Sequence, residues 1–242
     1  MRRATRIAAA FALAAMAAPQ ALAQGGCPAP LDGVRRLVMV TADGMNSVAA
    51  RMQLFERAGP RSPWRALGAA EPALIGRAGM GWSQFYRNFS RPGEPIKVEG
   101  DKRAPAGVYA IGHSFGTVPS SRPGHIPVTS DTICVHDLSS PAYNTITSRR
   151  LVGPKVDAEN MSKILPMYRR GLVVNYPTDA RSRAGSCIFI HVWKAPNVGT
   201  AGCIALPEAR MIALQDFAVS GTALALLPRA ALNRLRGCLP GV

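Results

Sequence analysis

Short runs of apolar, β-branched and aromatic residues alternate along this chain with turns that are rich in glycine and proline. Such runs favour β-strands, because branched and aromatic side chains pack well on a pleated surface. We expect strands over residues 34–41, 73–78, 96–98, 108–111, 132–135, 172–176, 187–193 and 222–227. Helical character is limited to residues 46–58, 161–168, 207–218 and 229–237. Many short strands and few helices predict a mainly β fold, built as a sandwich or a barrel.

The two remaining segments of note are irregular in pattern. Residues 79–82 are expected to form a turn, and residues 112–127 a long loop that binds a ligand or moves as a flap. No internal repeat divides the chain, so residues 34–242 are expected to form one domain that ends in a helix, after an N-terminal tail over 24–33.

The first 23 residues have the pattern of a secretory signal peptide. Arg2, Arg3 and Arg6 precede a run rich in alanine, phenylalanine and leucine, and Ala21-Leu22-Ala23 offers a small-x-small cleavage site. No later run is long and apolar enough for a transmembrane helix. We therefore expect a periplasmic or otherwise exported protein without a stable membrane anchor.

The chain is strongly basic, with 29 Lys and Arg against 14 Asp and Glu and a net charge of +15. Without the three arginines of the signal peptide the charge is still about +12. The positive residues are scattered, with no run or aromatic interleaving of the kind that nucleic-acid grooves use. For an exported protein this charge suits anionic polymers of the cell envelope, or it serves solubility alone. We expect no nucleic-acid partner.

Five cysteines, an odd number, lie in a chain that is expected to reach an oxidising compartment. Cys27 and Cys238 lie near the two ends of the mature chain, so a bond between them would join its termini. That choice would leave Cys134 to pair with Cys187 and would keep Cys203 reduced. Four cysteines allow three pairings, and the sequence leaves the connectivity open.

A histidine and the odd cysteine form the best candidate site. His191 lies near the end of the predicted strand 187–193, and a short loop with Pro196 and Gly199 leads back to Cys203 just before a helix. An imidazole close to a thiol can take its proton and make a reactive thiolate. The amides of Gly202 and Cys203 are candidates for an oxyanion hole. The alternatives are an ordinary disulfide or buried thiol and a packed histidine. No pair of cysteines has chelate spacing, so we expect no metal.

Four segments, in the right order along the chain, resemble the L,D-transpeptidase catalytic domain family. They are Gly-Ser-Cys-Ile-Phe-Ile-His at 185–191 with Thr-Ala-Gly-Cys at 200–203; Lys-Val-Glu-Gly-Asp at 97–101 with Arg-Ala-Pro-Ala-Gly at 103–107; Cys-Val-His-Asp at 134–137 with Ser-Pro-Ala-Tyr-Asn at 140–144; and Tyr-Arg-Arg-Gly at 168–171. The resemblance extends from about residue 34 to residue 227.

The resemblance implies an exported, mainly β enzyme that acts on peptidoglycan stem peptides without a cofactor. Cys203 would attack the L,D amide between diaminopimelate and D-alanine and then pass the acyl group to an amine of another stem. His191 would be the base and then the acid, with its ring oriented by the carbonyl of Val192, and the amides of Gly202 and Cys203 would form the oxyanion hole. Two further functions stay open: a carboxypeptidase or endopeptidase that uses water, and a non-catalytic module that binds the cell wall.

Two positions depart from the family's pattern, since Ala201 and Ala205 stand where most members have histidine and arginine. The loop between His191 and Cys203 is also shorter than in most members. Lys194 is a candidate to replace the missing cation and hold a substrate carboxylate.

Weaker candidates surround this motif. Thr200, Lys194, Tyr143 and Asn144 are the predicted substrate-binding residues, although a turn after a proline would also explain the last two. His136 with Asp137 is a weaker acid–base candidate. The sequence indicates no partner residue for His113 or His125, and Trp193 is expected in the core. The oligomeric state is not predicted.

Overall fold

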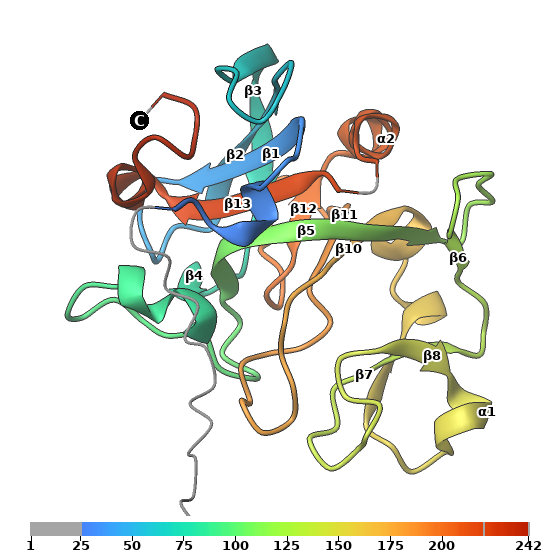
Figure 1. Cartoon of the computed structure of the whole chain (residues 1–242). Coiled ribbons are helices and arrows are strands. Elements are labelled where there is room, and N and C mark those ends of the chain that lie inside the picture. The colour runs from blue at the N-terminus through green and yellow to red at the C-terminus, as the bar shows by residue number, and fades with distance from the viewer. Residues whose placement is uncertain (1–25, 220, 242) are drawn as a thin grey trace, which may run out of the picture.

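The computed structural model describes residues 26–219 and 221–241. The expected signal peptide therefore lies outside the described residues. Most strands belong to one sheet with the order β10-β11-β12-β3-β2-β1-β13-β5-β4, while β6 pairs with β5. Because β10 also pairs with β5, the sheet closes on itself as a barrel (Figure 1). Its strands are β1 (Arg36–Ala42), β2 (Ala49–Glu56), β3 (Arg65–Leu74), β4 (Met80–Trp82), β5 (Ala104–Gly116), β6 (Ile126–Pro127), β10 (Gly171–Val174), β11 (Phe189–Val192), β12 (Ile204–Leu206) and β13 (Ala223–Pro228).

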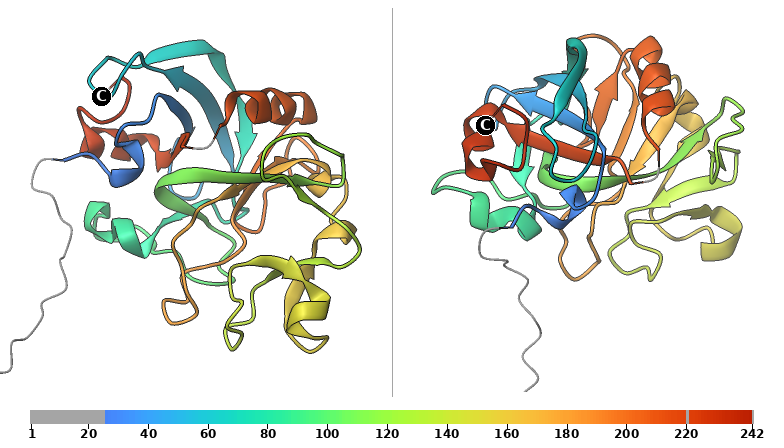
Figure 2. Two further views of the ribbon diagram at one scale, coloured as in Figure 1. Left: turned by 45° about the vertical axis from the view of Figure 1, so that its right-hand side comes forward. Right: turned by 45° about the horizontal axis from the view of Figure 1, so that its top comes forward.

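A second, three-stranded sheet stands apart from the barrel in all three views (Figures 1 and 2). It has the order β8-β7-β9, with β7 (Thr132–Val135) between β8 (Ile146–Ser148) and β9 (Ala158–Asn160), and the short helix α1 (Arg149–Val152) follows β8. The chain enters this small sheet after β6 and returns to the barrel at β10.

The helices are few and mostly short. The longest is α2 (Glu208–Phe217), which packs against β10 and β11 and buries Met211 and Leu214. The 3-10 helices are η1 (Ala29–Leu31), η2 (Gln84–Phe89), η3 (Met161–Lys163), η4 (Met167–Arg169) and η5 (Arg229–Leu235). No helix of the described part is long and apolar enough to cross a membrane. The mainly β fold predicted from the sequence is confirmed.

Several element predictions hold, among them the strands near 34–41, 132–135, 172–176, 187–193 and 222–227 and the helix near 207–218. The helix expected over 46–58 is wrong, because this segment is the strand β2. It pairs with β1 on one side and β3 on the other, with the side chains of Ala50 and Met52 buried. Pairing on both edges decides the conformation here against local preference.

Six other predictions need correction, one of which is the strand expected at 96–98, where Ile96 forms only an isolated bridge with Trp82. The turn expected at 79–82 contains the strand β4, which pairs with the start of β5. The loop expected over 112–127 begins later, because β5 continues to Gly116 and β6 occupies Ile126–Pro127. The helices expected at 161–168 and 229–237 are 3-10 segments rather than α-helices. The strand expected at 73–78 ends at Leu74 and begins earlier, at Arg65.

The buried side chains form two clusters. The larger one fills the barrel, and the smaller one lies between the barrel and the small sheet. In the smaller cluster the rings of Phe115, Tyr168 and Phe189 meet edge to face, with centroids 4.9–5.7 Å apart. Such contacts fix ring positions. Cys203 belongs to this cluster, so the candidate thiol is part of a closely packed group of aromatic side chains.

Candidate active site

A cavity of about 630 Å³ lies beside the smaller core cluster. Its wall combines the ends of β11 and β12, the loop that joins them, η4 and residues of the small sheet. The lining residues are Arg77, Glu99, Gly100, Lys102, His136, Asp157, Glu159, Ile164, Met167, Tyr168, Ser186, Cys187, Ile188, His191, Lys194, Val198, Gly199, Thr200, Ala201, Gly202, Cys203 and Ala205. Both members of the predicted cysteine–histidine pair therefore line one cavity.

Strand register brings this pair to one face of the sheet. β11 and β12 run parallel, with His191 opposite Ala205. Side chains alternate between the two faces of a sheet, so Cys203, two residues before Ala205, is directed to the same side as His191. Both side chains are buried.

The ring of His191 is held on two sides. Its Nδ1 lies 2.8 Å from the carbonyl oxygen of Val192, and the ring of Tyr168 meets it edge to face with centroids 5.4 Å apart. A carbonyl oxygen only accepts hydrogen bonds, so Nδ1 carries the proton of the neutral ring and Nε2 is left as the base. Burial lowers the pKa of His191 to about 4, and the contact to Val192 opposes this shift only in part. The imidazole is therefore neutral at pH 7.

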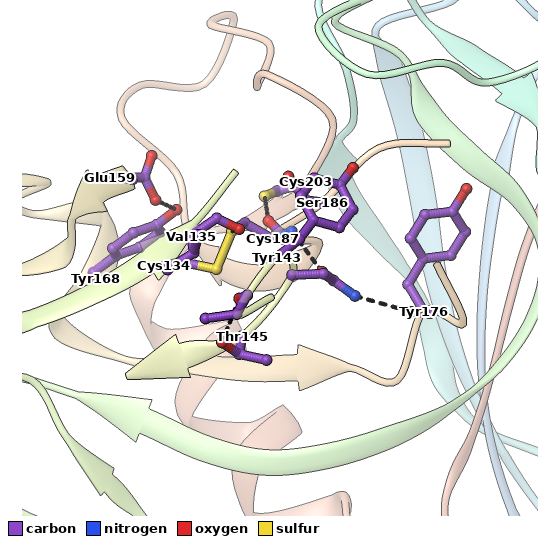
Figure 3. Close-up of a disulfide and its surroundings, with 12 residues drawn as sticks. Cys134, Val135, Tyr143, Thr145, Glu159, Tyr168, Tyr176, Ser186, Cys187 and Cys203 are labelled. Atoms are coloured by element: carbon purple, nitrogen blue, oxygen red, sulfur yellow. Dashed lines mark hydrogen bonds between the residues drawn. A yellow bond between two sulfur atoms is a disulfide. The ribbon is translucent and has the colours of Figure 1, made fainter. Parts of the chain in front are cut away.

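The thiol of Cys203 is also uncharged at rest. Its sulfur donates to the carbonyl oxygen of Cys187 at 3.4 Å (Figure 3). Burial raises the pKa of the Cys203 thiol to about 12, although the backbone amide of Phe189 and the charge of Lys97 act in the opposite direction. A preformed thiolate–imidazolium pair is therefore disfavoured, and proton transfer has to accompany attack by the sulfur.

The backbone around the thiol is fixed by the hydroxyl of Thr200. Its Oγ1 accepts the Gly202 N–H at 3.0 Å and donates to the Cys203 carbonyl at 2.7 Å. Gly202 has φ of +145°, and a Cβ atom here would lie 2.9 Å from the carbonyl oxygen of Arg103. Glycine is therefore required at this position. The Gly202 amide, predicted as an oxyanion donor, is directed at Thr200 in this structure.

Two disulfides are formed, Cys27–Cys238 and Cys134–Cys187, and Cys203 is free. This is the pairing that the positions of the cysteines suggested. The second disulfide joins β7 of the small sheet to the segment that leads into β11 (Figure 3). It therefore holds the two sides of the cavity together, and its Cys187 supplies the carbonyl that the thiol contacts.

Comparison with known proteins identifies the family of this chain. The family model for the L,D-transpeptidase catalytic domain (YkuD) matches residues 47–226. The chain belongs to the L,D-transpeptidase catalytic domain family. A search of curated proteins finds no match. Among solved structures, Bd1075 of Bdellovibrio bacteriovorus is similar with a TM-score of 0.42 and 16% identity, over 84% of this chain and 54% of that one. The chain thus spans about half the length of that protein.

Not all of the predicted substrate-binding residues reach the cavity of this L,D-transpeptidase family member. Thr200 and Lys194 line it, but Tyr143 and Asn144 do not. The Tyr143 hydroxyl donates to the Glu99 carboxylate, and Asn144 accepts the amide of Cys187 at 2.9 Å. They contact residues that form the wall, and their predicted role in substrate binding stays a prediction.

The two residues that differ from the family's pattern, Ala201 and Ala205, both lie at the cavity. Ala205 is opposite His191 in the register of β11 and β12. The cavity therefore has methyl groups, and neither a ring nor a charge, at these two positions.

Charged residues that the sequence did not reveal also line the cavity. Arg77 is held beside the motif because its amide donates to the Thr200 carbonyl at 2.8 Å. Within residues 26–219 and 221–241, the side chains of Arg77, Lys102 and Lys194 make no ion pair or hydrogen bond. The acidic residues of the wall are Glu99, Asp157 and Glu159. Glu99 and Lys194 belong to segments already singled out in the sequence, whereas no sequence motif marks Arg77, Lys102, Asp157 or Glu159, which come from separate parts of the chain.

The weaker histidine candidates fall in different places. His136 lines the cavity but approaches Asp157, with Nδ1 3.4 Å from its carboxylate, while Asp137 is bonded to Ser139. The His136–Asp137 pair is thus not formed.

Trp193 is half-buried and belongs to neither core cluster, so its predicted core position is wrong. Neither His113 nor His125 lines the cavity. The described residues contain no cluster of three or more His, Cys, Asp or Glu suited to a metal.

Proposed function

We propose that this chain is an exported cysteine acyltransferase of the cell envelope. It cleaves the L,D amide between diaminopimelate and D-alanine in peptidoglycan stem peptides and passes the acyl group to an amine of another stem. The observation that carries the proposal is the buried pair of Cys203 and His191 on one face of the sheet, in a cavity of an L,D-transpeptidase family domain. Two disulfides support an exported, oxidised protein.

Acylation begins with both groups neutral. The Cys203 sulfur attacks the amide carbon while its proton moves to Nε2 of His191, and the carbonyl of Val192 stabilises the imidazolium through Nδ1–H. The imidazolium then gives this proton to the nitrogen of the departing D-alanine as the C–N bond breaks. A thioester on Cys203 remains, and His191 is neutral again.

The surrounding residues have supporting roles in this proposal. Thr200 holds the backbone of Cys203, and the amides of Gly202 and Cys203 stabilise the oxyanion, the former after exchanging its contact with Thr200. The unpaired cations Arg77, Lys102 and Lys194 attract the carboxylates of the stem. Tyr143 and Asn144 act indirectly, because they fix Glu99 and Cys187 in the cavity wall.

A carbapenem tests the nucleophile, since an activated β-lactam acylates a cysteine of this type. Incubation of the oxidised protein should add the mass of one carbapenem, and peptide mapping should place it on Cys203. Cys203→Ala should take up none. Absence of the adduct on the folded wild-type protein, or an unchanged adduct on Cys203→Ala, would overturn the assignment.

A further inference from the structure

A carboxylate on the small sheet is aimed into the cavity from the side opposite the barrel strands. Glu159 lies on β9, opposite Cys134 on β7. Directly opposed residues of an antiparallel pair share a face, so Glu159 lies beside the Cys134–Cys187 disulfide (Figure 3). The disulfide thereby fixes the distance between this carboxylate and the segment that carries His191.

Glu159 has one hydrogen-bond partner. Its Oε1 accepts the hydroxyl of Tyr168 at 2.6 Å, and Oε2 has no partner within residues 26–219 and 221–241. The other acids of the wall are better satisfied: Glu99 accepts Tyr143, Ser186 and the Gly100 amide, and Asp157 faces His136. No ion pair is formed by Glu159 in the described residues.

The surroundings of Glu159 do not favour its negative charge. Burial raises its pKa, and the hydrogen bond from Tyr168 and the nearby His136 compensate only in part. Glu159 also acts on the thiol, because its charge contributes to the raised pKa of Cys203. A half-buried carboxylate with a free oxygen next to a cavity gains most from a cationic ligand group.

We propose that Glu159 binds the ammonium group of the acceptor stem, and that this contact directs the acyl-enzyme toward transfer rather than hydrolysis. The inference rests on the proposed function, because it requires a thioester on Cys203. It assigns the two sides of the cavity to the two halves of the reaction. The barrel side makes the acyl-enzyme, and the small-sheet side selects the group that receives the acyl chain.

The proton balance follows from this placement. The bound ammonium gives one proton to Glu159, and the resulting amine attacks the thioester carbon. The C–N bond forms while the C–S bond breaks, and the second proton leaves the new amide nitrogen through His191 to the Cys203 sulfur. Glu159 then releases its proton to solvent, which restores the resting protein.

Glu159→Gln tests the proposal, because it keeps the hydrogen bond from Tyr168 and removes the charge. Purified protein with both disulfides formed is incubated with tetrapeptide muropeptides, and cross-linked dimers are separated from tripeptides. We expect the ratio of dimers to tripeptides to fall about tenfold, the size typical of losing one charged hydrogen bond. Carbapenem acylation of Cys203 should not slow, because removing the charge of Glu159 lowers rather than raises the pKa of the thiol.

Two further variants separate charge from fold. Asp216→Asn removes a carboxylate outside the cavity, one whose side chain is 78% exposed, and it should leave the ratio unchanged. Tyr168→Phe keeps the ring beside His191 and deletes the hydroxyl that holds Glu159, so it should lower the ratio in the same direction by less.

The outcomes are distinct. A wild-type protein that makes tripeptides but no dimers, or a Glu159→Gln variant with an unchanged ratio, would overturn the role of Glu159 and leave the nucleophile intact. A wild-type protein that converts no tetrapeptide and takes up no carbapenem would overturn the proposed function, and this role with it. If Glu159→Gln does not fold, the ratio for Tyr168→Phe decides.

Discussion

The two walls of the cavity are built in different ways. On the barrel wall, His191 lies on β11 and Cys203 directly precedes β12; both are buried and carry no charge at rest. On the small-sheet wall, His136, Asp157 and Glu159 are charged or titratable and lie closer to solvent. In the proposed function, the buried pair makes and breaks the bonds, and the polar residues of the small sheet take part in recognition.

The two disulfides also differ in where they lie relative to the cavity. Cys27–Cys238 joins the ends of the described chain across 211 residues and contacts the barrel core. Cys134–Cys187 spans 53 residues and joins the two cavity walls. One is placed to stabilise the barrel, and the other to fix the relation between the walls.

The largest effect is expected on the barrel wall. His191→Gln keeps a side chain of similar size but removes the base, so carbapenem acylation of Cys203 should slow about a thousandfold, within the usual range for general bases. The rate is measured by mass spectrometry over time. His113→Gln is the matched control, since His113 is exposed and outside the cavity, and its rate should be unchanged. Equal rates for both variants would contradict the role of His191.

Removal of each disulfide should separate stability from activity. For the loops that they close, chain entropy assigns about 5 kcal/mol to Cys27–Cys238 and about 4 kcal/mol to Cys134–Cys187. Cys27→Ala with Cys238→Ala should therefore lower the Tm more but preserve the acylation rate. Cys134→Ala with Cys187→Ala should lower the Tm less but slow acylation about tenfold, because the wall and the carbonyl that contacts the thiol lose their anchor.

Both disulfide variants are compared below their unfolding temperatures, with the folded fraction measured by circular dichroism. Rates that fall in proportion to the loss of Tm in both variants would mean that the second disulfide has no special relation to the site.

A smaller effect is expected for the unpaired cations of the cavity. Arg77→Ala and Lys194→Ala should each raise KM for a tetrapeptide about threefold and leave kcat nearly unchanged, because both side chains are exposed and solvent weakens their attraction to the substrate. Lys155→Ala, an exposed lysine outside the cavity, is the control. A loss of kcat without a change in KM would show that these cations do not bind the ground-state substrate.

The barrel wall could be predicted from the sequence to a large extent. A continuous apolar run marks the strand with His191, and Pro207 followed by the acidic Glu208 marks the start of α2. These signals depend only on neighbouring residues in the sequence. The same is true of Gly202, whose lack of a side chain allows the positive φ of the backbone there. The segment 46–58 was mistaken for a helix, because its strand character depends on partners on both sides rather than on its own residues.

Most of the charged residues that line the cavity were not predicted. Glu159 and Arg77 reach the cavity through strand pairings and loop contacts between distant parts of the chain, which leave no pattern in a single sequence. Tyr143 and Asn144 were assigned to the cleft by the resemblance, and in the structure they contact residues that form its wall. Recognition residues on loops follow from tertiary structure and are the least accessible to local reasoning.

The smallest effect concerns pH, and it tests the protonation states of the cysteine–histidine pair on the barrel wall. The pKa of His191 is about 4, so the base stays neutral as the pH falls from 8 to 5, and carbapenem acylation should change less than about threefold over this range. A histidine with an ordinary pKa of 6.5 would lose most of its activity there.

Alkylation by iodoacetamide needs the thiolate itself, and the thiol pKa is about 12. Its rate should therefore rise about tenfold per pH unit from 7 to 9 without a plateau. A plateau in alkylation near neutral pH would instead indicate a preformed ion pair of Cys203 and His191.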